Sequence, residues 1–569
     1  MALVVGCGDD DPGSDGGEGG DGGETAGSSS GGSGKAGGNT AGSSNDAGMS
    51  NPDPIGGAGG GDTDPPVGGD GGAITGGGGE GGGPDTFAEI TEVDDNIYTQ
   101  VSDLRGLRFS TIDNSNKLWA SGHKGIIPNP ATLADPDKVV VVARFLPNGL
   151  PDTTFGGDGF IELNLTPRVI NTTPEPDEVT NDGNEDSLGI VELANGDVVV
   201  AANRRDAAGK GMDAVLVRLN SAGEYVNTFG VQGVATLTFG WPAAEDATFP
   251  SAPAAAPSDT TWGLEVDSST VGTEKLVVFG LGSAAKGQMT TGNAPVQRTD
   301  NDRYVTRVLA TTGAIDPGFN NGAAFFYNSG GIFGDNARRG IVEADGSILS
   351  AGYVNLGESL GNHIVAIRLL PSGTRDMTFG HGVSAKGVIR SNPLINDGGV
   401  AECYNLVRQA DGRIITTGYG AATGAGIASS FGYATTTAPD LVSFAFTADG
   451  KAIDDTFGNA GMFIAQSEGT PLLTRFEERG RDMDILADQR LVYAGNYGED
   501  PAIFVATPDG DFDPQNGIGN LFTYEPLPLN GTSTSHFFRV VASPDGSLIA
   551  ASTSQNAAGV LLAILKVGE

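Results

Sequence analysis

A repeated phrase constrains the fold of this chain more than any other feature. In each copy, two apolar runs flank a tight turn rich in Gly, Asp and Asn, followed by a Phe-Gly connection. Copies begin at Val140, Leu216, Thr306, Ala366, Phe444 and, less regularly, Phe504. The phenylalanine falls at Phe155, Phe229, Phe319, Phe379 and Phe457, with Asn516 in the sixth copy. A fixed phrase with insertions between copies indicates a repeat architecture, with a unit of about 60 residues.

A second hairpin precedes each copy of the phrase. These hairpins begin at Gly106, Gly189, Gly263, Gly340, Asn405, Asp482 and Arg539. Most carry Asn-Gly or Asp-Gly between two apolar runs, which is the strongest short-range signal for a β-hairpin. Two hairpins in succession predict a four-stranded antiparallel unit.

The last unit is incomplete at the C-terminus. The segment 559–567 starts a final hairpin but supplies only one strand, whereas 85–93 resembles the strand that follows the Phe-Gly connection. Pairing these two segments would close a ring and remove its sheet edges. The sequence therefore predicts an all-β, seven-bladed β-propeller whose N-terminal strand closes the last blade. An open β-solenoid is the alternative, although it gives no reason for a split unit.

The pattern V-x-R-L-x-x-x-G-x-x-D-x-x-F-G-x-x-G resembles the delta-60 repeat of large bacterial secreted and surface proteins. The resemblance covers nearly all of residues 86–569 and implies a propeller-like β fold. It supplies no catalytic residues. The fifth and sixth copies depart from it, because Ala445 and Ala506 replace the arginine and Asn516 replaces the phenylalanine.

Recurring charged residues in the phrase are interpreted as structural. The aspartates are Asp152, Asp316, Asp376 and Asp454, and the arginines of the preceding strand are Arg144, Arg218, Arg307 and Arg368. We expect each aspartate to cap its turn or to pair with the arginine, while the phenylalanine fills the gap between blades. Gly156 and Gly159 should supply positive φ angles. A metal-ligand role for the aspartates is the alternative, but a functional site rarely needs so many copies.

The N-terminal region predicts a tether and an anchor. Residues 1–7 end in Val-Val-Gly-Cys, which resembles the lipobox of bacterial lipoproteins with Cys7 as the lipidated residue. Residues 8–85 are mostly Gly, Ser and Asp, so they cannot offset their conformational entropy and are predicted to be a disordered linker before the repeat domain at 86–569. These features predict a protein attached by lipid to the bacterial cell envelope, at the outer membrane or cell surface. The alternative is a chance cysteine after a short apolar start.

Charge and side-chain chemistry exclude several functions. A net charge of −39 argues against nucleic-acid binding. The four histidines, at 123, 363, 381 and 536, have no zinc-ligand spacing, and 182–186 lacks the rest of a calcium loop. Cys403 lies in an apolar stretch and is predicted to be a buried free thiol. We expect no metal, no cofactor and a monomeric protein.

One set of aligned residues carries the functional hypothesis. The residue before the first strand of each unit is Arg105, Leu188, Trp262, Arg339, Tyr404, Arg481 or Phe538. Three arginines and three aromatics at the mouth of one channel would suit an anionic or sugar-like ligand. The alternative is packing between blades, with arginine paired to acids such as Asp482 or Asp484. Long, irregular B–C and D–A connections, on the face opposite the short turns, predict one variable binding face.

Three functions remain open at this point. A non-enzymatic binding or scaffold module, recognising a glycan or anionic ligand on the variable face, is favoured because no catalytic signature is present. A propeller hydrolase or lyase acting on polysaccharide is the second. It would require acids and arginines gathered on the variable face, with raised carboxyl pKa values. A structural array that contacts another envelope protein is the third, and an exposed apolar patch would favour it.

Overall fold

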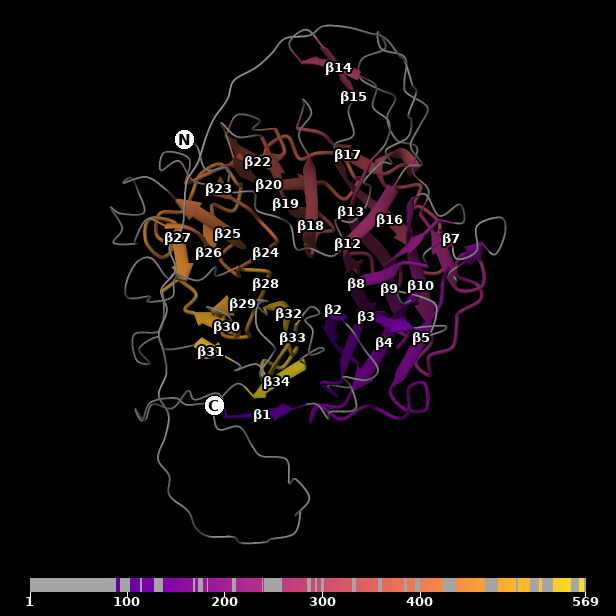
Figure 1. Ribbon diagram of the computed structural model, residues 1–569. Helices are drawn as coiled ribbons and strands as arrows, with labels where there is room; N and C mark the ends of the chain where they lie inside the picture. Colours follow the sequence, from indigo (N-terminus) through magenta and orange to yellow (C-terminus); the bar gives the residue numbers. More distant parts are fainter. Residues whose placement is uncertain are drawn as a thin grey trace, which may run out of the picture. The chain divides into compact units, whose positions relative to one another are not determined.

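The computed structural model describes strand β1 and most of residues 103–566, with gaps mainly in the connections between strands. The described strands form seven antiparallel sheets of the kind expected for propeller blades, arranged as a ring in Figure 1. Each sheet follows the predicted order, with consecutive strands as neighbours. The seven-bladed β-propeller is therefore confirmed. In the described part of the chain, no helix is long and apolar enough to cross a membrane.

The first four blades have these bounds. The first contains β2 (Asp103–Phe109), β3 (Leu118–Ile126), β4 (Asp137–Phe145) and β5 (Phe160–Leu163). The second contains β8 (Glu185–Glu192), β9 (Val198–Arg205), β10 (Met212–Leu219) and β11 (Val234–Thr236). The third contains β12 (Ser258–Asp267), β13 (Lys275–Ser283), β16 (Asp302–Leu309) and β17 (Phe325–Tyr327). The fourth contains β18 (Asp335–Val342), β19 (Ile348–Asn355), β20 (Asn362–Leu369) and β22 (Val388–Ser391), with β21 (Gly380–Gly382) parallel to β22.

The remaining strands complete the ring. The fifth blade contains β23 (Val400–Ala401) and β24 (Asn405–Arg408), which both pair with β25 (Ile414–Ala422), then β26 (Thr436–Phe446) and β27 (Met462–Ala465). The sixth contains β28 (Asp482–Ile485), β29 (Leu491–Tyr497), β30 (Asp500–Ala506) and β31 (Leu521–Thr523). The seventh contains β32 (Phe537–Ala542), β33 (Leu548–Thr553), β34 (Leu562–Lys566) and β1 (Ala88–Glu92). Two small hairpins, β6 (Val169–Asn171) with β7 (Glu178–Asn181) and β14 (Gln288–Thr291) with β15 (Ala294–Gln297), lie outside the blades.

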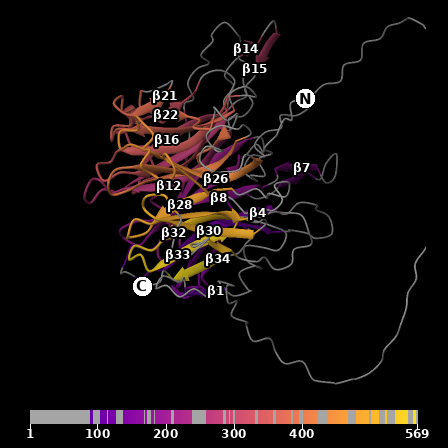
Figure 2. The ribbon, with the colours of Figure 1, turned by 90° about the vertical axis from the view of Figure 1, so that its left-hand side faces the viewer.

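Two features of the structure show that the ring is closed. Strand β1 pairs antiparallel with β34, which confirms the predicted contribution of the N-terminal segment to the last blade (Figure 1). Seven clusters of the apolar core each join two neighbouring blades, and one of these contains Leu104 and Phe145 of the first blade with Leu548 and Ile564 of the seventh. The blades follow one another closely in the side view (Figure 2). Packing between sheets, without a disulfide in the described residues, thus holds the ring.

The phenylalanine of one unit packs on the turn glycine of the next. Gly373 has φ +81°, and a Cβ placed on it would lie 2.8 Å from Cδ2 of Phe319. The amide of Asn320 also donates to the carbonyl of Ser372 at 2.7 Å. The same pairing of phenylalanine and positive-φ glycine recurs at Phe155 with Gly223, Phe229 with Gly313, Phe379 with Gly450, and Phe457 with Gly510. The repeated Phe and Gly are therefore two halves of one contact between blades.

The recurring aspartate has both of the predicted structural roles at once. In the first blade, Oδ1 of Asp152 accepts from the amide of Thr154 at 3.1 Å, and Oδ2 accepts from Nε of Arg144 at 2.8 Å. The guanidinium of Arg144 also lies 5.2 Å from the ring centroid of Phe155. Gly156 and Gly159 have φ angles of 62° and 96°, as predicted.

Candidate functional site

A β-bulge interrupts the innermost strand at the residues that the sequence alignment picked out. The register of pairing shifts around Arg105, Leu188, Trp262, Arg339 and Phe538. In the fifth blade, Tyr404 falls in the break between β23 and β24. A bulged residue is left out of the ladder, so its side chain is free to turn away from the sheet.

These side chains meet across the axis of the ring. Nη2 of Arg339 donates to the carbonyl of Arg105 at 3.4 Å, although their strands belong to the fourth and first blades. Both guanidinium groups lie over the ring of Phe538 from the seventh blade, at 5.0 Å for Arg105 and 5.8 Å for Arg339. Trp262 and Leu188 pack with Phe538 in one apolar cluster. The sequence alignment therefore identified residues that the fold brings together.

We call this set the channel plug: Arg105, Leu188, Trp262, Arg339, Tyr404, Arg481 and Phe538. Every member is buried, with at most 7% of its surface exposed. Arg481 lies 5.1 Å from the ring centroid of Tyr404. Burial and mutual packing agree with the alternative that these residues hold the blades together, whereas ligand binding by the whole set stays a prediction.

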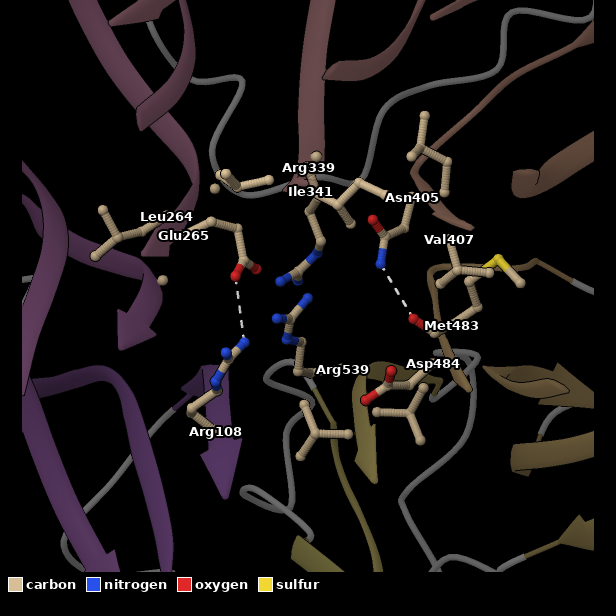
Figure 3. Close-up of a pocket in the computed structure, with 17 residues that line it drawn as sticks. Arg108, Leu264, Glu265, Arg339, Ile341, Asn405, Val407, Met483, Asp484 and Arg539 are labelled. Atoms are coloured by element: carbon tan, nitrogen blue, oxygen red, sulfur yellow. Dashed lines mark hydrogen bonds and ion pairs between the residues drawn. The ribbon is translucent and has the colours of Figure 1, made fainter. Parts of the chain in front are cut away.

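A cavity of about 200 Å³ lies beside the plug. Its polar lining includes Arg108, Arg339, Arg539, Glu265 and Asp484, and its apolar lining includes Leu264, Ile341, Val407 and Met483 (Figure 3). Most of these residues follow the bulge along the inner strand, so the cavity lies on the side of the short A–B turns. We call it the arginine cavity. The predicted variable face is on the other side, and its connections lie largely outside the described residues.

Exposure of the arginine side chains falls from the entrance of the cavity to the plug. The side chain is 37% exposed in Arg108, 12% in Arg539, 9% in Arg339 and 0% in Arg105. Arg108 pairs with Glu265 at 3.2 Å (Figure 3). The guanidinium groups of Arg339 and Arg539 face each other at the centre of Figure 3. A series of arginine side chains thus extends from the solvent to the plug.

One carboxylate is shared by the two central arginines. Asp482 lies 3.5 Å from Nε of Arg339 and 3.0 Å from Nη1 of Arg539. It also accepts from the amide of Val540 at 3.0 Å and from Nδ2 of Asn405 at 2.7 Å. Burial, together with the neighbouring charge of Arg539, lowers the pKa of Arg339 to about 9. Two guanidinium groups and one carboxylate thus meet in these contacts, and Glu265 and Asp484 are the further acids of the lining.

Asp484, the second acid near the central arginines, is hydrogen-bonded to the backbone. Oδ2 of Asp484 accepts from the amide of Ala542 at 2.9 Å, so it satisfies an inner-strand amide of the next blade. Burial raises the pKa of Asp484 above its ordinary value. The amides of Ala542 and Ile485 and the nearby charge of Arg539 act against this rise.

A second charged cluster lies on the opposite side of the plug. Asp103, Asp186 and His123 come from β2, β8 and β3, and their ligand atoms lie within 4.8 Å of one another. Nδ1 of His123 is 3.3 Å from Asp186 and 3.7 Å from Asp103. Arg105 contacts both carboxylates, at 2.5 Å from Asp103 and 3.4 Å from Asp186. Because this guanidinium already neutralises part of the cluster, we do not assign a metal ion to it.

The two carboxyl groups of this cluster have separated pKa values. Burial raises the pKa of Asp103, against the attraction of Arg105 and His123. Burial also acts on Asp186, but Arg105 and His123 outweigh it and lower its pKa to about 2. One carboxyl group is therefore more easily protonated than the other, although they share the same arginine.

The other predicted sites have mixed outcomes. Cys7, the tether and Asp182, the first residue of the segment that lacks a complete calcium loop, lie outside the described residues. Cys403 is buried, its thiol donates to the carbonyl of Asn405 at 3.3 Å, and burial raises its pKa to about 12. The prediction of a buried free thiol is confirmed.

Sequence reasoning named Asp484 only as a partner for the plug arginines, and it did not identify Arg108, Arg539 and Glu265 as part of a cavity. Arg539 stands one position after the bulge, and Arg108, Glu265 and Asp484 stand three positions after it. The same alignment would have found them if these later positions had also been compared. In the cluster around His123, Asp103 and Asp186 each stand two positions before an aligned plug residue, so the alignment could also have found them, whereas His123 lies on another strand.

Comparisons with known proteins bear on architecture only. No family model matches the sequence, and no curated protein matches it. Among solved structures, the polysaccharide lyase Uly1 is 11% identical with a TM-score of 0.38, covering 81% of this chain and 89% of that one. The GH93 α-L-arabinofuranosidase of Fusarium graminearum is 10% identical with a TM-score of 0.35, covering 85% and 98%. Such low scores carry no argument about function.

Proposed function

We propose that this chain is a non-enzymatic binding propeller that holds an anionic group in the arginine cavity. The observation that carries the proposal is the ordered series of Arg108, Arg539, Arg339 and Arg105, whose side chains become progressively more buried towards the plug. Buried guanidinium groups that share a single carboxylate gain from an added anion. An anion would supply the charge that Asp482 alone does not.

The chemistry of the cavity favours a carboxylate or sulfate group. Guanidinium presents planar, paired donors that match both of these groups. A volume of about 200 Å³ is below the usual range of about 300–1,000 Å³ for sites that enclose whole drug-sized ligands. The cavity therefore suits a charged substituent or a single acidic sugar, with any remaining polymer outside. Apolar walls from Leu264, Ile341 and Val407 exclude water and strengthen the charge interaction.

We also propose that this binding module is displayed from the bacterial envelope. The support is the resemblance of the segment ending in Cys7 to a lipobox, the Gly-rich composition of residues 8–85 and the delta-60 pattern of the repeats. A Gly/Ser-type coil of 78 residues has an end-to-end distance of roughly 50 Å, which would hold the propeller clear of a membrane surface. Metabolic labelling with a fatty-acid analogue, compared between the wild type and Cys7→Ala produced from the full gene, tests the anchor.

Calorimetric titration of the full chain tests the anion site. We expect sulfate and glucuronate to bind and glucose, which has no charge, to give no heat. Arg539→Gln should weaken binding by about tenfold or more, because a charged hydrogen bond contributes about 1.5–3 kcal/mol. Arg490→Gln is the matched control. Nε of Arg490 lies 2.7 Å from Asp488, and neither residue lines the cavity. Equal binding by both variants, or no binding of either anion, would refute the proposed site.

A polysaccharide-cleaving enzyme is the second candidate, and one observation favours it. Asp103, Asp186, His123 and Arg105 gather on the side of the plug that leads to the variable connections, and the pKa values of the two carboxyl groups are shifted in opposite directions. Two neighbouring carboxyl groups whose pKa values are shifted apart are suited to different roles in general acid–base catalysis. Product analysis after incubation with soluble polysaccharides, using Asp103→Asn as the inactive control, separates this candidate from pure binding.

A further inference from the structure

A groove of about 940 Å³ runs along the outer edge of the second blade, apart from the channel. Its lining comes from three blades. Asn164 follows β5 of the first blade, Arg204, Tyr225, Asn227 and Gln232 belong to the second, and Thr312 lies in a turn of the third. We call it the rim groove.

The lining of the rim groove has an unusual chemistry for this protein. None of its 14 lining residues is Asp or Glu, although the chain contains 71 of them. It offers the amides of Asn164, Asn227 and Gln232, and one guanidinium from Arg204. Tyr225 is 39% exposed, so part of its ring is open to a ligand. Aromatic, amide and hydroxyl groups without carboxylates match a polyhydroxylated ligand, whether neutral or acidic.

The repeat departs from its pattern at this groove. The position of the recurring aspartate is occupied by Val226, which lies between the lining residues Tyr225 and Asn227. The arginine of this copy, Arg218, pairs instead with Asp197 of the same blade, at 2.6 Å and 2.9 Å. The ion pair that stabilises the blade is thus kept, while the carboxylate is absent from the segment that lines the groove.

Among the five copies that keep the motif phenylalanine, only the second has an aromatic residue at this position, and its ring is held in place; the sixth copy has Phe512 there. Counting back from the motif phenylalanine, the equivalent residues are Pro151, Ile315, Arg375 and Ile453. The backbone of Tyr225 bridges to Leu219, as it does at the equivalent residues. Gly233 lies against the ring, because a Cβ there would come 2.7 Å from Cδ1 of Tyr225. A ring fixed in advance binds with a smaller entropy cost.

The guanidinium of Arg204 is also positioned before any ligand binds. Nη2 of Arg204 donates to Oγ1 of Thr236 at 3.1 Å, and Nε lies 3.7 Å from Asp213. These contacts use only part of its five donors. Arg204 lines the same groove as the three amide side chains.

We propose that the rim groove binds a saccharide chain, with a sugar ring against Tyr225 and its hydroxyl groups hydrogen-bonded to Asn164, Asn227 and Gln232. This site is separate from the arginine cavity and does not depend on the function proposed for it. A surface groove admits an internal segment of a polymer, whereas the cavity in the channel admits only a single group. The two sites would give the propeller two separate contacts with its surroundings.

Affinity electrophoresis of the full chain tests the proposal. The probes are native gels that contain a mixed-linkage β-glucan, a galactomannan, an arabinoxylan or an alginate. We expect at least one polymer to retard the wild type, and Tyr225→Ala to raise the dissociation constant by about tenfold or more, as for aromatic residues that dominate other interfaces. Tyr225→Phe should retain most of the retardation because the ring remains.

Two further variants keep the test independent of folding. Asn227→Ala removes an exposed amide from the groove and should also weaken retardation. Arg375→Ala is the matched control, because Arg375 is the exposed equivalent of Tyr225 in the fourth blade. This variant should migrate like the wild type. The proposal is overturned if no polymer retards the wild type. It is also overturned if Tyr225→Ala and Asn227→Ala are retarded as strongly as Arg375→Ala.

Discussion

Substitution of the turn glycine at 373 tests whether the Phe–Gly contact holds neighbouring blades together. Alanine at a φ of +81° costs about 1–2 kcal/mol from backbone strain alone. Its Cβ would also lie 2.7 Å from the amide nitrogen of Asn320 and 2.8 Å from Cδ2 of Phe319, which forces those atoms to move. Overpacking of this kind costs about 1–3 kcal/mol. Weakening of the hydrogen bond from Asn320 to Ser372 adds about 1 kcal/mol.

The matched control is Gly272→Ala. Gly272 has a similar φ of +75°, but a Cβ there has no atom within 4 Å, so this variant measures the backbone strain alone. We expect Gly373→Ala to lower the free energy of unfolding by about 3–6 kcal/mol and Gly272→Ala to lower it by about 1–2 kcal/mol. Urea unfolding followed by tryptophan fluorescence measures both, provided that the m value is unchanged.

A double substitution isolates the contact with the ring. Phe319→Ala alone should destabilise by about 3–5 kcal/mol, because the side chain is fully buried. In that background, Gly373→Ala should lose much of its extra cost, since the ring that the Cβ would meet is absent. The reasoning is refuted if the two glycine variants are equally destabilised, or if the effects of Phe319→Ala and Gly373→Ala simply add.

Three further predictions follow from the charges and from ring closure. Arg144→Ala should lower the free energy of unfolding in urea by about 1.5–3 kcal/mol, because Asp152 loses a buried charged hydrogen bond and keeps Lys117 as its charged partner, whereas Arg490→Ala should cost less than about 1 kcal/mol. Sulfate affinity in calorimetry should fall as the pH rises through about 9, because Arg339 loses its proton there, and a constant affinity between pH 7 and 10.5 would contradict its role. Deleting residues 1–93 should expose the edge of β34 and cause self-association in light scattering, whereas deleting residues 1–85 should not.

The repeat made the blade architecture predictable. Alternating apolar residues and tight Asn-Gly or Asp-Gly turns determine strand pairing locally, so the hairpins after Gly189 and Gly340 could be placed without coordinates. The split unit identified β1 as the closing strand. The ion pair of Arg218 was not predictable, because Val226 replaces the usual aspartate and the substitute, Asp197, lies in a different turn of the blade.

The sequence by itself determined the blades, their number, the closing strand and the bulge residues, because each depends on short-range pairing or on alignment of repeats. Only the tertiary structure decided which charges meet. Arg105 and Arg339 touch because the ring brings opposite blades together at its axis. Asp103, His123 and Asp186 meet through neighbouring strands of two blades. Their burial, pKa values and shared partners depend on distances across the closed ring, which no local pattern encodes.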